Sequence, residues 1–329
     1  MNQAKKSADK LLHALENHIQ GFSYGESPKE LYEPIAYIMS LGGKRIRPLL
    51  TLMAYSLYRE DFQNILTPAL AVEVFHNFTL MHDDIMDDAP LRRGNQTVHE
   101  KWNANTAILS GDVMLVKAYD MLLEIEADKL HECIRFFNKT AAEVCEGQQK
   151  DMNFETLPTV SEEDYIDMIR LKTAVLLGFA LQFGAIMAGA PKADALHLYN
   201  FGVNIGIGFQ LKDDLLDVYA DKTKFGKQVG GDIISNKKTF LLLKAKELAK
   251  GDTKTLLENW IEAKDFDKAE KVGAVTAIYD ELGIKELTES KMKEYFDKGF
   301  SEFASLKVPY QNQFQELLDL TQNLVDRER

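Results

Sequence analysis

The sequence predicts an all-α protein. Almost every window of the 329-residue chain places apolar residues at i, i+3, i+4 and i+7, the spacing of one buried helix face. No stretch alternates apolar and polar residues between turn signals, as a half-buried strand does. Several of the eight prolines stand at plausible helix starts or stops, and no Ser/Gly-rich or Pro-rich linker separates two domains. We therefore expect one helical domain over residues 1–329.

The composition is that of a folded protein that does not bind nucleic acid as its main partner. Hydrophobic residues make up 45% of the chain and charged residues 27%, close to the averages for globular proteins. The net charge of −12 argues against a nucleic-acid partner, because such binding depends on neutralising phosphates with Lys and Arg. The only two cysteines, Cys133 and Cys145, form no CxxC pair, so neither a disulfide framework nor structural zinc is indicated.

No segment is expected to cross a membrane or to act as a secretory signal. The start of the chain is charged and amphipathic and lacks the apolar core that a signal requires. The longest apolar stretch, 174–190, is interrupted by Gln182 and is shorter than the ~20 residues that a membrane span needs. We expect a buried helix there and a protein of the reducing cytoplasm.

Two helices are expected to carry the residues that matter for function. The first begins at Thr67-Pro68, because Thr is a good N-cap and Pro is favoured at the first helical position, and it ends before Pro90. The second runs from about Ala193 through Tyr219. Near its end each helix carries the sequence Asp-Asp-x-x-Asp, formed by Asp83, Asp84 and Asp87 in the first and by Asp213, Asp214 and Asp217 in the second.

These aspartates are unfavourable in a helix that binds no cation. Asp83 and Asp87 lie one turn apart on the same face, as do Asp213 and Asp217, and like charges at this spacing destabilise by roughly 0.2–0.5 kcal/mol per pair. Asp is a poor helix former, and both clusters stand at electronegative C-terminal helix ends. A bound cation accounts for all three penalties, and an oxygen-only ligand set favours Mg²⁺, Mn²⁺ or Ca²⁺ over zinc. The alternative, acidic helix ends solvated by water, is weakened by the presence of two copies in apolar sequence.

Basic residues accompany each acidic cluster, as phosphate substrates would require. Mg²⁺ takes one or two carboxylates and completes its shell with water and phosphate oxygens, so two facing clusters would hold a metal-bridged diphosphate. The turn at 42–47 places three cations before a helix start, which suits an anion. Arg92 and Arg93 follow the first cluster and either bind phosphate oxygens or pair with the preceding aspartates. The second cluster is followed by a loop that contains Lys224, Lys227, Lys237 and Lys238. Any one of these lysines, taken singly, is better explained as a solvent-exposed charge, and it is the order of acidic cluster and then basic loop, occurring twice, that favours phosphate binding.

Together these motifs resemble those of the trans-isoprenyl diphosphate synthases, the polyprenyl synthetase family. The matching stretches are GGKRIRP at 42–48, HNFTLMHDDIMDDAPLRRG at 76–94, GD at 111–112, LKTA at 171–174, GFQLKDDLLD at 208–217 and KFGKQVGGDIISNKKT at 224–239. The resemblance implies a helical bundle around a central apolar cavity. It also implies a Mg²⁺-dependent prenyltransferase that joins isopentenyl diphosphate head-to-tail to an allylic diphosphate such as dimethylallyl, geranyl or farnesyl diphosphate.

The resemblance further implies roles for individual residues. Three Mg²⁺ ions, which Mn²⁺ can replace, would be held on the allylic diphosphate by Asp83 and Asp87 with Asp84, and by Asp213 with Asp214 and Asp217 nearby or linked through water. The same diphosphate would be bound by Arg92, Lys172, Lys227 and Lys237. Isopentenyl diphosphate would be bound by Lys44, Arg47, His76 and Arg93. Lone pairs or dipoles near the developing carbocation would come from Lys172, Thr173 and Gln210.

Product length and assembly are also implied by the family. A bulky residue shortly before the first motif closes the floor of the chain-elongation shaft, and here Phe78 stands five positions before Asp83, with the smaller Thr79 at four. A single aromatic residue there resembles short-chain synthases, with the C20 product geranylgeranyl diphosphate favoured and C15 farnesyl diphosphate next. The floor could be shared with Phe75 or a neighbouring helix. The family also implies a homodimer.

Two alternative functions fit the sequence less well than prenyl chain elongation. Terpene cyclases share the fold and the first motif, but their second metal site is usually Asn/Asp-x-x-Ser/Thr-x-x-x-Glu, whereas this chain has Asp-Asp-Leu-Leu-Asp at 213–217. Non-catalytic regulatory subunits of prenyl synthases generally lack one or both aspartate motifs, and this chain has both. Chain elongation is therefore the favoured activity.

Overall fold

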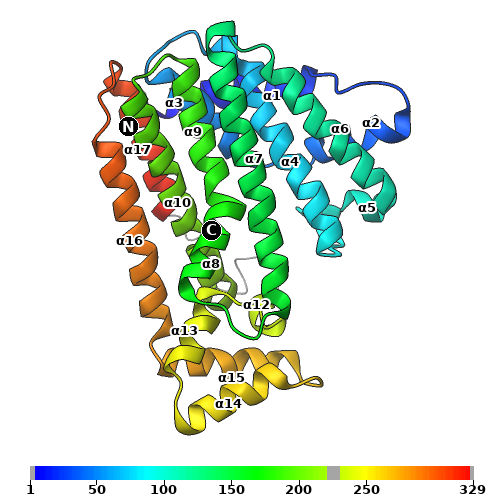
Figure 1. Ribbon diagram of the computed structural model, residues 1–329, viewed down its shortest axis with the longest axis vertical. Coiled ribbons are helices and arrows are strands. Elements are labelled where there is room, and N and C mark those ends of the chain that lie inside the picture. Colours follow the sequence, from blue (N-terminus) through cyan, green and yellow to red (C-terminus); the bar gives the residue numbers. More distant parts are fainter. Residues whose placement is uncertain (1–3, 221–229, 327–329) are drawn as a thin grey trace. The chain divides into compact units, whose positions relative to one another are not determined.

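The computed structural model describes residues 4–220 and 230–326 and confirms the all-α class (Figure 1). Within these ranges the only strands are β1 (Leu91–Arg92) and β2 (Asn95–Gln96), which form one antiparallel pair. The chain divides into two compact units: unit 1 is Met1–Lys139, Leu177–Tyr199 and Ser305–Leu324, and unit 2 is Thr140–Leu176, Asn200–Ala304 and Val325–Arg329. Several boundaries between the units fall inside continuous helices. The expectation of one domain over 1–329 stays a prediction.

Unit 1 consists of helices and the small hairpin. Its elements are α1 (Ala4–Gly21), α2 (Lys29–Ser40), α3 (Ile46–Ser56), the 3₁₀ helix η1 (Phe62–Ile65), α4 (Leu66–Met86), β1, β2, α5 (Val98–Lys101), α6 (Ala104–Leu122) and most of α17 (Gln311–Asp326). Three further helices are divided between the units: α7 (Ala127–Thr156), α9 (Val175–Met187) and α10 (Lys192–Tyr219).

An aromatic row fixes the core of unit 1. The Phe75 ring of α4 meets Phe137 of α7 edge-on at a centroid distance of 5.1 Å, and Phe137 meets Phe179 of α9 at 5.8 Å. Phe179 stacks on Phe183 at 4.9 Å. All four side chains are almost fully buried, and such aromatic pairs add about 0.5–1.5 kcal/mol each beyond their buried area. The helix that carries the first aspartates is therefore held on its apolar side by aromatic side chains of α7 and α9 that pack in one continuous row.

The start of α4 differs from the prediction. Ile65 is the N-cap residue, and α4 begins at Leu66 as a continuation of η1. The Thr67 hydroxyl lies 3.2 Å from His18 Nε2 on α1, so it links two helices and does not cap its own. The Thr67 N-cap prediction was wrong because the preceding turn already has helical geometry.

The end of α4 is set before Pro90 is reached. Asp88 adopts left-handed backbone geometry with φ 49°. The Asp88 N–H donates to the Ile85 carbonyl at 3.3 Å and the Ala89 N–H donates to the Asp84 carbonyl at 3.0 Å, the paired hydrogen bonds of a Schellman motif. The chain therefore leaves the helix directly after Asp87, the last residue of the first aspartate motif.

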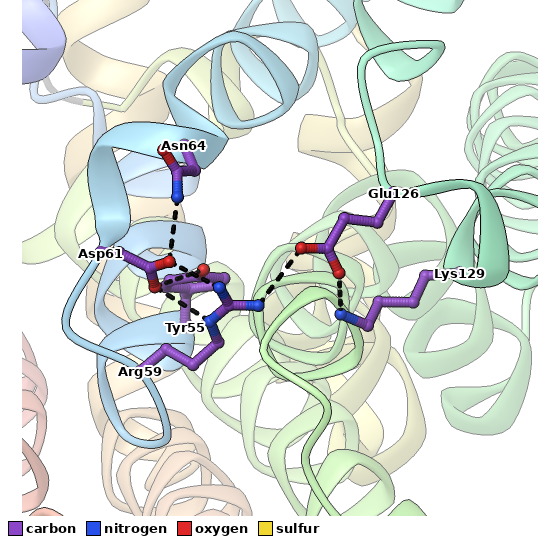
Figure 2. A network of polar contacts seen from close by, with 6 residues as sticks. All are labelled: Tyr55, Arg59, Asp61, Asn64, Glu126 and Lys129. Atoms are coloured by element: carbon purple, nitrogen blue, oxygen red, sulfur yellow. Dashed lines mark hydrogen bonds and ion pairs between the residues drawn. The ribbon is translucent and has the colours of Figure 1, made fainter.

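A polar network closes the connection between α3 and α4 (Figure 2). Arg59 binds both oxygens of Asp61, at 2.9 Å from Nε and 2.5 Å from Nη2, and Asn64 donates to the same carboxylate at 2.9 Å. These hydrogen bonds from Arg59 hold the pKa of Asp61 at about 2. Arg59 also donates to Glu126, which accepts from Lys129, so the network links the connection to the start of α7.

Unit 2 contains the second predicted helix and the C-terminal helices. Its own elements are α8 (Glu162–Ile169), the π-helix η2 (Arg170–Ala174), α12 (Gly231–Ile234), α13 (Phe240–Leu248), α14 (Gly251–Glu262), α15 (Lys268–Glu281) and α16 (Ile284–Ala304). In Figure 1, α14 and α15 lie side by side. The bounds of α10 agree with the helix expected from about Ala193 through Tyr219.

One buried cluster of unit 2 joins the helix that carries the second aspartates to its neighbours. It contains Phe154, Tyr165, Met168, Ile169, Ala174, Ile207, Leu211 and Phe240. These residues come from α7, α8, η2, α10 and α13. The cluster thus fixes η2 beside the polar face of α10.

One helical stretch, Glu162–Met187, is apolar and long enough to cross a membrane by composition alone. The most apolar window of this stretch is 72% buried inside the protein. This burial is the pattern of a core helix of a soluble protein, as expected for residues 174–190.

The contact between α9 and α3 gives a stability prediction. A Cβ at Gly184 would overlap the Thr51 carbonyl oxygen, and this backbone atom cannot rotate away. We expect Gly184→Ala to lower the free energy of unfolding by about 3 kcal/mol, the upper range for overpacking. Gly273 on α15 has open space around its Cβ position, so Gly273→Ala should raise stability by about 0.5–1 kcal/mol. Urea denaturation of both variants measures the difference, and equal effects would contradict the packing argument.

Candidate active site

A buried ion pair holds the basic turn of unit 1. Arg45, the N-cap of α3, has left-handed geometry with φ 47°. Its Nη1 donates to Glu73 Oε1 on α4 at 2.7 Å, and its Nη2 donates to the Met39 carbonyl at 2.6 Å. The Arg45 and Glu73 side chains are only 2% and 3% exposed. Arg45 is therefore an internal anchor of the turn, whereas Lys44 is exposed.

Arg47 and His76 lie in direct contact. Arg47 Nη1 is 3.1 Å from His76 Nε2. Because a guanidinium can only donate, Nε2 accepts and the imidazole proton resides on Nδ1. Burial lowers the pKa of His76 well below 6.5, and the nearby positive charges of Arg47 and Arg93 lower it further. His76 is thus a neutral ring among guanidiniums.

The hairpin brings Arg93 to the same turn. Arg93 and Gly94, with φ 53° and 78°, form the two-residue turn between β1 and β2. Arg93 Nη1 donates to the Gly42 carbonyl, and a Cβ at Gly43 would lie 3.0 Å from the Arg93 guanidinium carbon. The structure therefore gathers the predicted residues Lys44, Arg47, His76 and Arg93, the cationic group of unit 1, around one turn.

The cationic group has unused hydrogen-bonding capacity. Arg47 Nε is buried and has no hydrogen-bond partner in the part of the chain that the structure describes. Burial also lowers the pKa of Arg47 and of Arg93, since charge is costly away from water. A polyanion placed here would satisfy the donor and offset the accumulated positive charge.

Arg92 pairs with the first aspartate cluster. Its Nε lies 2.8 Å from each oxygen of Asp84, and its Nη2 lies 2.6 Å from Oδ1. Of the two roles left open for Arg92, this structure contains the aspartate pairing. Asp84 is 2% exposed, while Asp83 is half-buried and Asp87 is exposed at the end of α4. Asp83 and Asp87 are thus the more accessible carboxylates of this motif.

The second aspartate cluster in unit 2 is divided in the same way. Asp214 is 4% exposed and accepts hydrogen bonds from the Tyr165 hydroxyl and, at 3.2 Å, from Gln210 Nε2. Burial raises the pKa of Asp214 to about 7. Asp213 is exposed, and half-buried Asp217 accepts the Asp232 N–H at 2.9 Å. The three carboxylates therefore have different surroundings.

The predicted Lys172, Thr173 and Gln210 lie around the π-helix η2. Thr173 Oγ1 donates to Gln210 Oε1 at 3.3 Å, and Lys172 Nζ lies 2.7 Å from Asp151 Oδ2. Gly147 of α7 contacts the Lys172 backbone so closely that a Cβ there would overlap it. The wide π turn and this glycine together set where the two η2 side chains emerge.

The basic loop after α10 is only partly described. Lys237 is exposed, and its charge lowers the pKa of both Asp214 and Asp232, although burial raises each overall. Lys238 Nζ donates to the carbonyls of Phe154 and Glu155. The predicted residues Lys224 and Lys227 lie outside the described residues.

The residues expected to set product length lie on α4. The Phe78 ring lies 4.8 Å from the His82 ring and 5.7 Å from Phe75, and the Thr79 hydroxyl donates to the His76 carbonyl at 2.8 Å. His82 packs over Gly111 of α6, where a Cβ would overlap the imidazole. The predicted Gly-Asp sequence at 111–112 thus leaves room for the ring that supports Phe78.

Several polar residues of these sites were missed by sequence reasoning. They are Glu73, Asp151, Tyr165 and Asp232. Glu73 could have been found, because it is a lone charge inside the apolar run of α4. Asp232 stands within the matching stretch 224–239, but its role depends on a backbone N–H that no residue pattern reveals.

The chain is similar to known proteins in both sequence and structure. It matches the Polyprenyl synthetase family model over residues 28–281. A geranylgeranyl diphosphate synthase from Methanosarcina mazei is 35% identical over 91% of this chain and 86% of the relative. A short chain isoprenyl diphosphate synthase from Methanocaldococcus jannaschii is 42% identical over 72% of each chain. A crystal structure of a geranylgeranyl pyrophosphate synthase has a TM-score of 0.91, with 42% identity over 100% of both chains. Since the family model spans most of its length, this chain belongs to the polyprenyl synthetase family.

Proposed function

We propose that this short-chain prenyltransferase joins isopentenyl diphosphate head-to-tail to dimethylallyl, geranyl or farnesyl diphosphate and stops mainly at C20, geranylgeranyl diphosphate. The observation that carries the proposal is the cationic group of unit 1. There the neutral His76 ring lies beside Arg47, whose buried Nε has no hydrogen-bond partner in the described residues and could donate to an anion. The C20 length is supported by the relatives named geranylgeranyl diphosphate synthase and by the single aromatic residue Phe78 before the first motif.

The carboxylates fit Mg²⁺ by the chemistry of their donors. Asp83 and Asp87 in unit 1 and Asp213 and Asp217 in unit 2 offer oxygen ligands only, with accessible positions for water and phosphate oxygens. Three Mg²⁺ ions, replaceable by Mn²⁺, would supply Lewis-acid stabilisation of the leaving diphosphate. Asp84 and Asp214 would join these ligands or orient them from behind.

Two groups of basic side chains would each bind one of the two diphosphates. Lys44, Arg47 and Arg93 bind the diphosphate of isopentenyl diphosphate, and neutral His76 accepts from Arg47 and so orients it. Arg92, Lys172, Lys227 and Lys237 bind the allylic diphosphate. The allylic C–O bond breaks with its electron pair leaving on diphosphate, which Arg and Lys charges stabilise.

Carbon–carbon bond formation then needs a site that tolerates a cation. The double bond of isopentenyl diphosphate attacks the allylic carbon, and the proton lost afterwards goes to the departing diphosphate. Thr173 donates its hydroxyl hydrogen to Gln210, so the Thr173 oxygen lone pairs remain to face the developing cation. Gln210 Nε2 donates to Asp214, and Oε1, which accepts from Thr173, keeps a second lone pair for this role.

We further propose a homodimer in the cytoplasm. Leu109, Val116 and Leu123 recur every seven residues along α6 and its C-cap, with exposed fractions of 58%, 59% and 63%. An apolar helix face of this kind is a common protein contact surface. The homodimer that the family implies would bury it.

Incubation of the protein with labelled isopentenyl diphosphate, geranyl diphosphate and Mg²⁺ should yield a longer prenyl diphosphate. A hydrocarbon would indicate a terpene cyclase, and no product would indicate a regulatory subunit.

Asp83→Ala or Asp87→Ala should lower turnover by several orders of magnitude while the fold persists, because like-charge repulsion is relieved as a metal ligand is lost. Asp297→Ala, at an exposed position of α16, is the matched control. Activity of either motif variant within about tenfold of wild type would rule out the metal assignment.

Arg47→Gln should raise the Michaelis constant for isopentenyl diphosphate. Loss of a charged hydrogen bond of about 1.5–3 kcal/mol corresponds to roughly a ten- to hundredfold increase. Steady-state kinetics with each substrate varied in turn separates the two diphosphate sites. Arg135→Gln, an exposed position on α7, should change neither constant. An increase confined to the allylic substrate would reverse the assignment.

Phe78→Ala should make longer products. Removing the ring takes away the side chain that packs between Phe75 and His82 and opens the space beyond the first motif. Chromatography of dephosphorylated products from wild type and variant, both checked for folding by circular dichroism, measures the change. An unchanged distribution would place the floor of the shaft elsewhere.

A further inference from the structure

Three potential metal ligands meet at the base of the β1–β2 hairpin, outside both aspartate motifs. One ligand atom from each of Asp88, His99 and Glu100 lies within 4.8 Å of the other two. Asp88 is the left-handed residue that ends α4, and the other two residues belong to α5, directly after the hairpin. The cluster thus joins the two ends of the segment that carries Arg92 and Arg93.

The imidazole of this cluster is buried and unsatisfied. The His99 side chain is 8% exposed, and both ring nitrogens are buried without a hydrogen-bond partner in the described residues. An unsatisfied buried polar group costs about 1–3 kcal/mol. The nearest carboxylate oxygen, Glu100 Oε1, lies 3.7 Å from Nε2, too far for a hydrogen bond but close enough to share a metal ion. A cation bound between them would use the free nitrogen lone pair.

The donor set selects a class of ion. One imidazole with two carboxylates suits Mn²⁺, Co²⁺ or Zn²⁺ better than Mg²⁺, which prefers oxygen ligands alone. With ligand bonds of about 2.0–2.2 Å, two donors to one ion lie at most about 4.4 Å apart. Asp88 and Glu100 are exposed and can rotate inward by the remaining distance, while the buried ring stays fixed.

We infer that Asp88, His99 and Glu100 form a site for a divalent transition-metal ion that fixes the base of the hairpin. The two ends of the segment are already joined, since the Thr97 hydroxyl donates to the Ala89 carbonyl at 2.8 Å and the Thr97 N–H donates to the Pro90 carbonyl at 3.2 Å. The ion adds a second cross-link at the same place. It thereby limits the motion of Arg92 against Asp84 and of Arg93 against Gly42.

Titration with Mn²⁺ alone, without diphosphate or Mg²⁺, tests the site independently of the proposed function. Electron spin echo modulation of bound Mn²⁺ should show coupling to ¹⁴N in the wild-type protein. His99→Asn should remove this coupling and weaken the tightest Mn²⁺ site at least about tenfold. Asp83→Ala, which alters the neighbouring motif, and His131→Asn, at an exposed position of α7, should leave the coupling in place.

A second variant keeps the test decisive if His99→Asn does not fold. Asp88→Asn with Glu100→Gln changes only exposed side chains, and Asn tolerates the left-handed geometry at 88. It should lose the tight Mn²⁺ site and the nitrogen coupling although the His99 ring remains. No nitrogen coupling in the wild type at saturating Mn²⁺, or coupling that persists in either variant, would overturn the inference.

Discussion

The buried ion pair between Arg45 and Glu73 is the constraint on which the cationic group of unit 1 depends. Arg45 is held in left-handed geometry at the start of α3, and its guanidinium is bound by a carboxylate from α4 and by the Met39 carbonyl. Removing one partner of such a pair leaves an uncompensated buried charge, at a cost of about 3–5 kcal/mol. Glu73 also accepts from Asn77 one turn along α4 at 3.1 Å, so the turn and the helix of the first aspartates are fixed together. The positions of Lys44 and Arg47 follow from this anchor.

The aspartate motifs are likewise partly satisfied by partners within the protein. A helix does not favour three carboxylates at its C-terminal end, and each unit relieves part of the repulsion internally. Arg92 neutralises Asp84, and Tyr165 with Gln210 satisfies Asp214. Of the outer carboxylates, Asp87 and Asp213 are exposed, whereas Asp83 and Asp217 are half-buried. Each motif therefore separates into a buried middle aspartate that the protein itself satisfies and outer aspartates whose repulsion a metal ion would relieve.

Much of this could be predicted from the sequence because it depends on local periodicity. The helical class and the bounds of α10 follow from apolar spacing, and both aspartate motifs are visible as residue patterns. The start of α4 was misplaced because η1 already provides a helical turn before Thr67, which needs no side-chain cap. The sequence also could not show which of Lys44, Arg45 and Arg47 is buried. Which of three neighbouring cations turns inward depends on Glu73, a residue from another helix.

The π-helix η2, which carries the predicted site residues Lys172 and Thr173 of unit 2, is the feature that could least be foreseen from the sequence. Nothing in Arg-Leu-Lys-Thr-Ala marks a widened turn. It lies where the absence of a side chain at Gly147 lets α7 touch the Lys172 backbone, so a residue of another helix constrains this turn. Within this turn Lys172 contacts Asp151, and the adjacent Thr173 contacts Gln210. Neighbouring residues on a helix point in different directions, about 100° apart on a regular α-helix, so each of the two side chains has its own partner. The position of Lys172 and Thr173, which are proposed to lie near the developing carbocation, is therefore constrained by a helix-packing contact at Gly147.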